Sequence, residues 1–194
     1  MTAAPYRNAA RALAAAAVIG ASAVVWHDLP TRSEVYAPFP VSGVLGAPAN
    51  GRALTATLSA VQIAPELEIR SEKFRAASLA AIGQWLVLET EIRSGDQPER
   101  AHAELIAGPD RYLPTDRLPA WARMTGTLQP GFLTRGAWVF DVAPAAITDR
   151  PVTLRTWVGD GFLDSRLDIR IDLRDGRVVR SEVASLPPTR VVVA

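Results

Sequence analysis

Two carboxylate pairs are the first residues of this chain whose types and spacing could do chemistry. Glu89 and Glu91 lie two positions apart in an alternating segment, so their side chains share one face of a predicted strand. Such a pair could transfer protons or bind calcium, but carboxylates on the solvent face of a strand usually serve solubility. Asp160 and Asp164, in GDGFLD, form the most calcium-like loop, yet this motif is too short for a calcium-binding loop. We expect neither pair to bind a metal.

Histidine and cysteine usage restricts the chemistry further. The two histidines, His27 and His102, do not have the spacing of a metal site or a catalytic triad, and we expect a structural role for His102. The absence of cysteine from the sequence excludes disulfides, thiolate metal sites, a cysteine nucleophile and a lipid-modified cysteine. Phosphate-binding, nucleophile-elbow, zinc-protease and dinucleotide motifs are also absent from it. The sequence therefore predicts a protein that is not an enzyme and has no cofactor.

Tryptophans and an alternating Arg–Asp segment remain as candidates for binding. Trp138 and Trp157 lie in predicted strands of ambiguous phase, so each could pack in the core or form an aromatic platform for carbohydrate or a partner protein, and we favour core packing. Residues 166–174, RLDIRIDLR, place apolar side chains on one face and charged ones on the other. The charged face could recognise a partner or keep the sheet soluble, and we favour the second, structural role. The weak candidate binding face comprises Trp121, Trp138, Trp157, Arg166, Asp168 and Arg170.

Short alternating segments separated by proline and glycine must position these residues. They predict strands in an all-β, immunoglobulin-like antiparallel β-sandwich, preceded by one N-terminal transmembrane helix. Asp175-Gly176 predicts a type I′ hairpin that leads into residues 177–180. Residues 71–82 resemble a short helix, with Ser71 as its cap and Gly83 as its stop. The predicted strands cover residues 53–61, 84–93, 103–107, 132–142, 152–158 and 166–174.

An unbroken run of apolar and small residues begins at Ala12 and ends at Trp26. It is long enough to enter a bilayer but short for a full span, which needs roughly 17–25 residues. The basic residues Arg7 and Arg11 precede the run, so we expect the leader to stay in the cytoplasm and the rest to be exported. The sequence therefore predicts a single-pass protein of the cell membrane whose C-terminal domain is extracytoplasmic.

The same segment could instead be a cleaved signal peptide. Ala21-Ser22-Ala23 resembles a cleavage site behind an apolar stretch of suitable length, and cleavage there would release a secreted protein that begins at Val24. Against cleavage, the apolar run continues through Trp26, where an interfacial aromatic residue would lie. A buried core helix is a third reading, and we favour the retained anchor.

The predicted organisation has four parts. Residues 1–27 form the cytoplasmic leader and signal anchor, and residues 28–52 form a linker rich in proline and glycine, part of which could add an edge strand. Residues 53–182 form the β-sandwich. Residues 183–194 form a tail whose apolar end could pair with a partner's sheet, close the protein's own sheet or fray.

Charge and composition limit the partners. Of 21 basic residues 19 lie beyond the apolar run, together with all 20 acidic residues, so the exported part carries a formal charge of −1. This balance gives no reason to expect nucleic acid or an anionic membrane surface as the main partner. Lys73 is the single lysine, a bias typical of a GC-rich genome such as that of an actinobacterium.

Three segments resemble a known family. They are an opening strand at residues 54–61, GQWLVLETEIR at residues 83–93 and, above all, LQPGFLTRGAWVFDV at residues 128–142, followed by Ala143-Pro144. They are similar to small exported immunoglobulin-like domains of Gram-positive bacteria, grouped with the actinobacterial immunoprotective extracellular proteins. The resemblance implies export and binding without catalysis. The chain departs from that pattern where Ser94-Gly95-Asp96 replaces an asparagine, and in its extra hairpin at residues 166–180.

These observations predict a non-catalytic binding or accessory module. We expect it to be held in the membrane by the run from Ala12 to Trp26 and to bind another protein of the cell envelope. The alternative is a secreted immunoglobulin-like domain that binds a small apolar ligand or a glycan through its aromatic residues.

Overall fold

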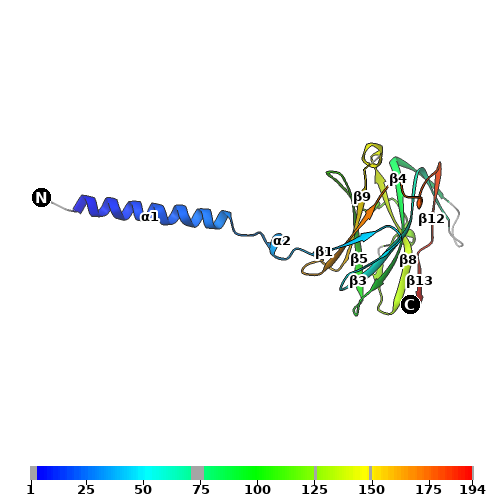
Figure 1. The fold of residues 1–194 in the computed structure, drawn as a ribbon, viewed down its shortest axis with the longest axis horizontal. Helices are drawn as coiled ribbons and strands as arrows, with labels where there is room; N and C mark the ends of the chain where they lie inside the picture. Colours follow the sequence, from blue (N-terminus) through cyan, green and yellow to red (C-terminus); the bar gives the residue numbers. More distant parts are fainter. Residues whose placement is uncertain (1–3, 71–76, 125, 149, 194) are drawn as a thin grey trace. The chain divides into compact units, whose positions relative to one another are not determined.

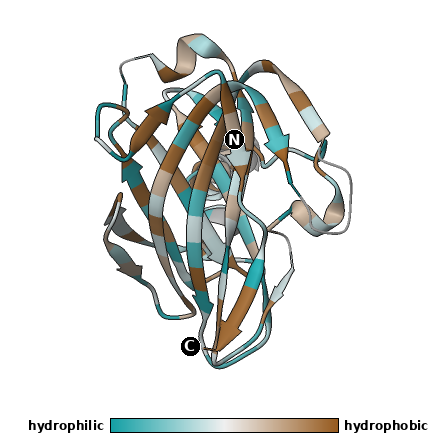
Figure 2. Ribbon diagram, turned by 90° about the vertical axis from the view of Figure 1, so that its right-hand side faces the viewer, coloured by the Kyte–Doolittle hydropathy of each residue, from teal (hydrophilic) through white to brown (hydrophobic). Residues whose placement is uncertain are grey.

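Alternating apolar side chains build two β-sheets in this chain, as Figure 2 shows in the bands of high and low hydropathy along the strands. The structure is a computed structural model that describes residues 4–70, 77–124, 126–148 and 150–193. It divides into two compact units, Met1–Ala37 and Pro38–Ala194. The predicted β-sandwich is confirmed in the second unit.

The first unit is helical. Helix α1, Ala4–His27, contains the apolar run, and the short helix α2, Arg32–Val35, follows it. By length and composition, the part Ala9–His27 is apolar enough to cross a membrane, and the same features occur in a signal sequence. The side chains of this part are exposed throughout. The structure thus shows one N-terminal apolar helix of the kind that the sequence predicts.

Sheet A is the smaller sheet of the second unit, and its strands β1, β5 and β9 are labelled in Figure 1. Its order is β1-β10-β9-β5-β6, and β7 pairs with one end of β5. The pairs are antiparallel except β1 with β10, which run parallel. The strands are β1 Phe39–Val44, β5 Glu99–Ala107, β6 Asp110–Tyr112, β7 Thr127–Leu128, β9 Val152–Val158 and β10 Ser165–Ile171.

Sheet B has the order β11-β3-β4-β8-β13, and both β2 and β12 also pair with the long strand β3. Strands β11 and β12 run parallel to β3, whereas β2, β4, β8 and β13 join antiparallel pairs. The strands are β2 Pro48–Asn50, β3 Leu54–Ile69, β4 Ala77–Ser94, β8 Phe132–Val142, β11 Val178–Arg180, β12 Val183–Leu186 and β13 Arg190–Val193.

Two apolar clusters stabilise the unit because each removes side chains from water. The larger cluster lies between the sheets and includes Leu88 and Phe140 of sheet B together with Leu105 and Leu154 of sheet A. The smaller cluster forms on the opposite face of sheet B, around Trp85. Short 3-10 helices lie at Ala120–Ala122, in a segment that covers this outer face, and at Pro144–Ile147. Sheet B therefore carries an apolar cluster on each face, although Glu91 and Arg135 remain exposed on the outer one.

The helix predicted for residues 71–82 is wrong for the part that the structure describes, which belongs to strand β4. Residues 77–82 are extended and belong to β4, whereas residues 71–76 lie outside the described residues. In this part of the strand, Leu79 pairs in register with Leu67 of β3 and packs against the outer cluster of sheet B. The pairing shifts between Ala64 and Glu66, where β4 carries several extra residues. Cross-strand pairing thus overrides local helix propensity here.

The sandwich also extends beyond the predicted range 53–182. Strands β1 and β2 come from the predicted linker, and β12 and β13 come from the predicted tail. The predicted hairpin at Asp175-Gly176 is wrong, because β10 belongs to sheet A while β11 pairs with β3 in sheet B. The Asp175 carboxylate instead accepts hydrogen bonds from the backbone and the guanidinium of Arg177, which shapes a turn between the two sheets.

Candidate functional site

The outward face of sheet A is the best candidate for a binding surface. In the described part of the chain, neither buried cluster contains an outward side chain of this sheet. Inward side chains alternate with outward ones along β5, β9 and β10, so the outward ones form adjacent rows. These rows contain His102 and Glu104 of β5, Arg155 and Trp157 of β9, and Arg166, Asp168 and Arg170 of β10.

A chain of ion pairs crosses the face. The Arg166 guanidinium donates two hydrogen bonds to the Asp168 carboxylate, at 2.8 and 3.1 Å. Asp168 also lies 3.6 Å from Nε of Arg155, whose Nη1 donates to Glu104 at 3.1 Å. Arg111 reaches the other oxygen of Glu104 at 3.8 Å. Because the carboxylates lie between arginines and are mostly buried, they hold these guanidinium groups in fixed positions.

An aromatic pair lies beside these ion pairs. The rings of Trp157 and His102 stack with centroids 5.7 Å apart and an interplanar angle of 17°, on residues paired directly across β9 and β5. Gly161 lies against the indole, since a Cβ at this position would come within 2.9 Å of the ring. Its φ of 71° also favours glycine. Trp157 is therefore held in place on both sides while part of it faces solvent.

Four of the six predicted binding residues lie together on the outward face of sheet A, namely Trp157, Arg166, Asp168 and Arg170. Trp138 does not belong to this face. It is 2% exposed and packs between the sheets, because its position in β8 points inward. Its Nε1 has no hydrogen-bond partner among the described residues. Trp138 also helps to line a cavity of about 80 Å³. Trp121 lies in the segment over sheet B and is 42% exposed.

Arg155, Glu104 and the stacking role of His102 were missing from the predicted site. The sequence shows that these side chains point outward, because each alternates with apolar residues that point inward. What the sequence lacked was the order of the strands, which places Arg155 between Glu104 and Asp168.

The other carboxylates considered above serve structural contacts. Glu89 accepts a hydrogen bond from the amide of Gln62 at 2.7 Å, and Glu91 forms an ion pair of the same length with Arg135. Both lie within sheet B and face partners on neighbouring strands.

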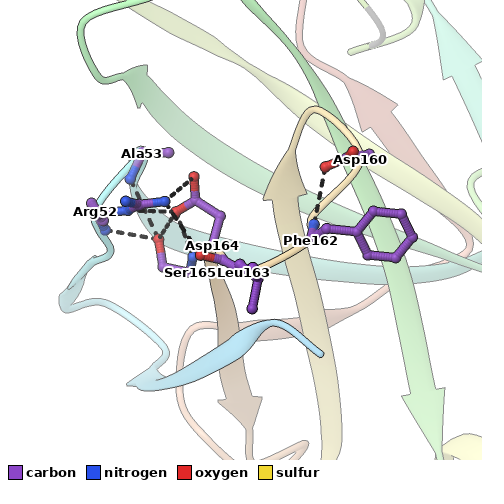
Figure 3. A network of polar contacts seen from close by, with 7 residues as sticks. All are labelled: Arg52, Ala53, Asp160, Phe162, Leu163, Asp164 and Ser165. Carbon is purple, nitrogen blue, oxygen red and sulfur yellow. Dashed lines mark hydrogen bonds and ion pairs between the residues drawn. The ribbon is translucent and has the colours of Figure 1, made fainter. Parts of the chain in front are cut away.

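A cleft of about 640 Å³ lies at the end of the sandwich where the chain enters β1. Figure 3 shows the polar network at its side. Nε and Nη2 of Arg52 contact the Asp164 carboxylate at 3.3 and 3.2 Å, and Nη2 also donates to the Leu163 carbonyl. The Ser165 hydroxyl accepts a hydrogen bond from the Arg52 backbone at 2.7 Å. The remaining lining includes Asp96, Glu99, the loop from Gly159 to Phe162, and Ala53.

The calcium-like loop lies in this cleft. The Asp160 carboxylate accepts a hydrogen bond from the backbone N–H of Phe162 at 3.0 Å, whereas Asp164 pairs with Arg52. Within the residues that the structure describes, no three acidic, histidine or cysteine side chains form a group that could hold a metal ion. The aspartates of this loop thus stabilise its own conformation.

The electrostatics of Asp164 follow from these contacts. Burial by itself would raise the pKa of the Asp164 carboxyl. The hydrogen bonds from Arg52 and from the backbone N–H of Ser165 outweigh this and hold the pKa below its ordinary value.

We expect the Arg52→Met substitution to raise the pKa of Asp164 toward its ordinary value, because the guanidinium stabilises the charged carboxylate. Since the folded-state pKa is depressed, the contact contributes stability above the unfolded pKa of about 4. This contribution is lost as the pH falls through the folded pKa. An NMR titration of the carboxyl carbons measures the change. Arg177→Met, which removes the partner of Asp175, is the control, and an unchanged Asp164 in Arg52→Met would contradict the assignment.

Comparisons with known proteins give little beyond the fold. No family model and no curated protein matches the sequence. A solved structure described as an uncharacterised β-sandwich protein from Clostridium difficile is similar, with 14% identity and a TM-score of 0.46. The match covers 72% of this chain and 99% of that one.

Proposed function

We propose that this protein is a membrane-anchored, extracytoplasmic, non-catalytic module that binds another cell-envelope protein through the outward face of sheet A. One observation carries the proposal: an apolar cluster covers part of the outward face of sheet B, whereas neither cluster covers the outward face of sheet A, where Trp157 and paired arginines remain partly exposed. Tryptophan and arginine are the residues most enriched at the energetic centres of protein interfaces.

The geometry of the face supports binding to a protein. The stacked Trp157 and the paired Arg166 lose little conformational entropy on binding, because the free protein already holds them in place. The charges on the face favour an acidic partner surface, because five arginines outnumber two carboxylates and give a formal charge of +3. The arginines are Arg100, Arg111, Arg155, Arg166 and Arg170, and the carboxylates are Glu104 and Asp168.

The membrane anchor is part of the proposal. Helix α1 supports it through its apolar length and through Trp26 at its end, where aromatic residues favour the membrane interface. The resemblance to exported immunoglobulin-like domains of actinobacteria supports the same location, and we keep it as a prediction. Sequencing the N-terminus of the protein purified from membranes tests the anchor. A protein that begins before Val24 supports it, and a protein in the medium that begins at Val24 contradicts it.

We expect the Trp157→Ala substitution to weaken partner binding by about thirty-fold, the factor that corresponds to roughly 2 kcal/mol. The measurement is photocrosslinking in intact cells with p-benzoylphenylalanine at Thr153 or Arg170, both on the outward face of sheet A. A discrete membrane-protein adduct should form and should decrease when Trp157 is replaced. The control positions are Ile82 and Val179, exposed side chains of sheet B. Equal adducts from all four positions would contradict the proposed interface.

A small-ligand function is the second candidate, favoured by the cleft of about 640 Å³ next to Trp157. Its mixed lining, with Phe162 beside several carboxylates, suits a glycan better than a purely apolar ligand. Screening soluble glycans for a rise in melting temperature tests this candidate.

A further inference from the structure

Three exposed apolar residues lie on neighbouring segments at the end of the sandwich where the chain enters it. Phe39, Phe162 and Leu163, here called the apolar tip, are 61%, 49% and 45% exposed. The Phe39 backbone N–H donates a hydrogen bond to the Asp164 carbonyl at 2.8 Å, so the start of β1 lies against the loop that carries the other two residues. The tip combines residues that are more than a hundred positions apart in the sequence.

The loop holds Leu163 in an unfavourable backbone conformation. Its φ is 49°, and it is the only residue other than glycine with a positive φ in the described part of the chain. Glycine adopts this region without the steric cost that a Cβ imposes. Two contacts fix the loop nevertheless: the Asp160 carboxylate accepts from the Phe162 N–H, and Arg52 donates to the Leu163 carbonyl. A half-exposed leucine held at a positive φ is a candidate for an external contact.

The position of the tip in the chain limits its distance from the membrane if α1 is anchored there. Residues 28–38 join α1 to Phe39, and eleven residues reach at most roughly 40 Å even when fully extended. If α1 is anchored, this segment, here called the tether, keeps the tip within roughly 40 Å of the bilayer. The tether itself carries further exposed apolar side chains, Leu29, Val35 and Tyr36.

We propose that Phe39, Phe162 and Leu163 insert into the interfacial region of the membrane that holds α1. This inference rests on the proposed membrane anchor. Apolar burial drives the contact, as in other interfacial anchors. The charges beside the tip give it no attraction to anionic lipid, because Arg52 is paired with Asp164 while Asp96, Glu99 and Asp160 lie in the adjoining cleft. The insertion therefore takes place equally in zwitterionic membranes.

The absence of cysteine from the chain allows a direct test. Leu163→Cys in the full-length protein is labelled with an environment-sensitive fluorophore and reconstituted into phosphatidylcholine vesicles whose lipids carry bromine near the headgroup. Val44→Cys is the matched control, since Val44 is an exposed apolar residue at the other end of β1, about 17 Å from Phe39. We expect at least threefold stronger bromine quenching at residue 163 than at residue 44. Adding phosphatidylglycerol should not strengthen it.

A second variant separates insertion from mere proximity. Phe39→Ser combined with Phe162→Ser should reduce the quenching at residue 163 toward that at residue 44, while far-UV circular dichroism shows the same strand content. Leu163→Gly removes the steric cost of a side chain at this positive φ, so the melting temperature of the sandwich should not fall. These substitutions leave α1 unchanged.

The outcomes separate the two proposals. A full-length protein that fails to float with the vesicles overturns the membrane anchor. A protein that floats but shows equal quenching at residues 163 and 44 overturns the apolar tip alone. Quenching that requires phosphatidylglycerol also overturns it, because electrostatic attraction would then drive the contact.

Discussion

Replacing Trp85 with alanine is expected to lower the free energy of unfolding by about 3–5 kcal/mol, the usual cost of truncating a fully buried tryptophan. Trp85 is completely buried on the outer face of sheet B. Its Nε1 donates to the Leu79 carbonyl at 2.7 Å, and the Arg117 guanidinium lies 5.0 Å from the ring centroid. The substitution therefore leaves a cavity, removes the hydrogen bond to the Leu79 carbonyl and removes the ring beneath Arg117.

Urea unfolding of the full-length protein in mild detergent, followed by far-UV circular dichroism, measures this loss. Trp121→Ala is the matched control, because Trp121 belongs to the covering segment but faces partly outward. We expect the control to change the free energy by less than about 1 kcal/mol. A loss that small in Trp85→Ala would mean that the segment does not pack on sheet B.

We expect Gly83→Ala to lower the free energy of unfolding by about 3 kcal/mol, at the upper end of the range for adding a methyl group to a closely packed site. A Cβ at this position would collide with the Val142 carbonyl group, which is backbone and cannot move aside. The backbone N–H groups of Gly83 and Ile82 both donate to the Asp141 carboxylate, at 2.8 and 2.9 Å. Any shift that relieves the collision therefore also strains these hydrogen bonds at the bend of β4.

Gly176→Ala provides the matched control for Gly83→Ala. An added Cβ at Gly176 meets nothing within 4 Å, and its φ is not positive. We expect a small stabilisation of about 0.4–1 kcal/mol, because alanine restricts the unfolded chain. If both variants unfold at the same urea concentration, the bend at Gly83 does not have the close backbone approach described above.

Several elements could be predicted from the sequence because their signals are local. The apolar run from Ala12 to Trp26 contains residues that favour a helix in any apolar surrounding, and the structure confirms the helix. The predicted strands 132–142 and 152–158 are also confirmed, with the same bounds. Proline and glycine lie next to the ends of these strands. Between the ends, apolar residues either alternate with polar ones or form a dense apolar stretch.

Only the tertiary structure decided how these elements meet. Residues 77–82 became strand because Leu67 pairs across from Leu79, although alone they resemble a helix. Trp138 of β8 points inward because its side of the strand faces the core between the sheets. Trp157 of β9 points outward because it lies on the opposite side of its strand from the core residues. The ion pairs of Arg155 required β5 and β10 on either side of β9, although β10 lies some sixty residues after β5. Pairings between distant segments depend on the burial of the whole domain, and no local sequence pattern contains that information.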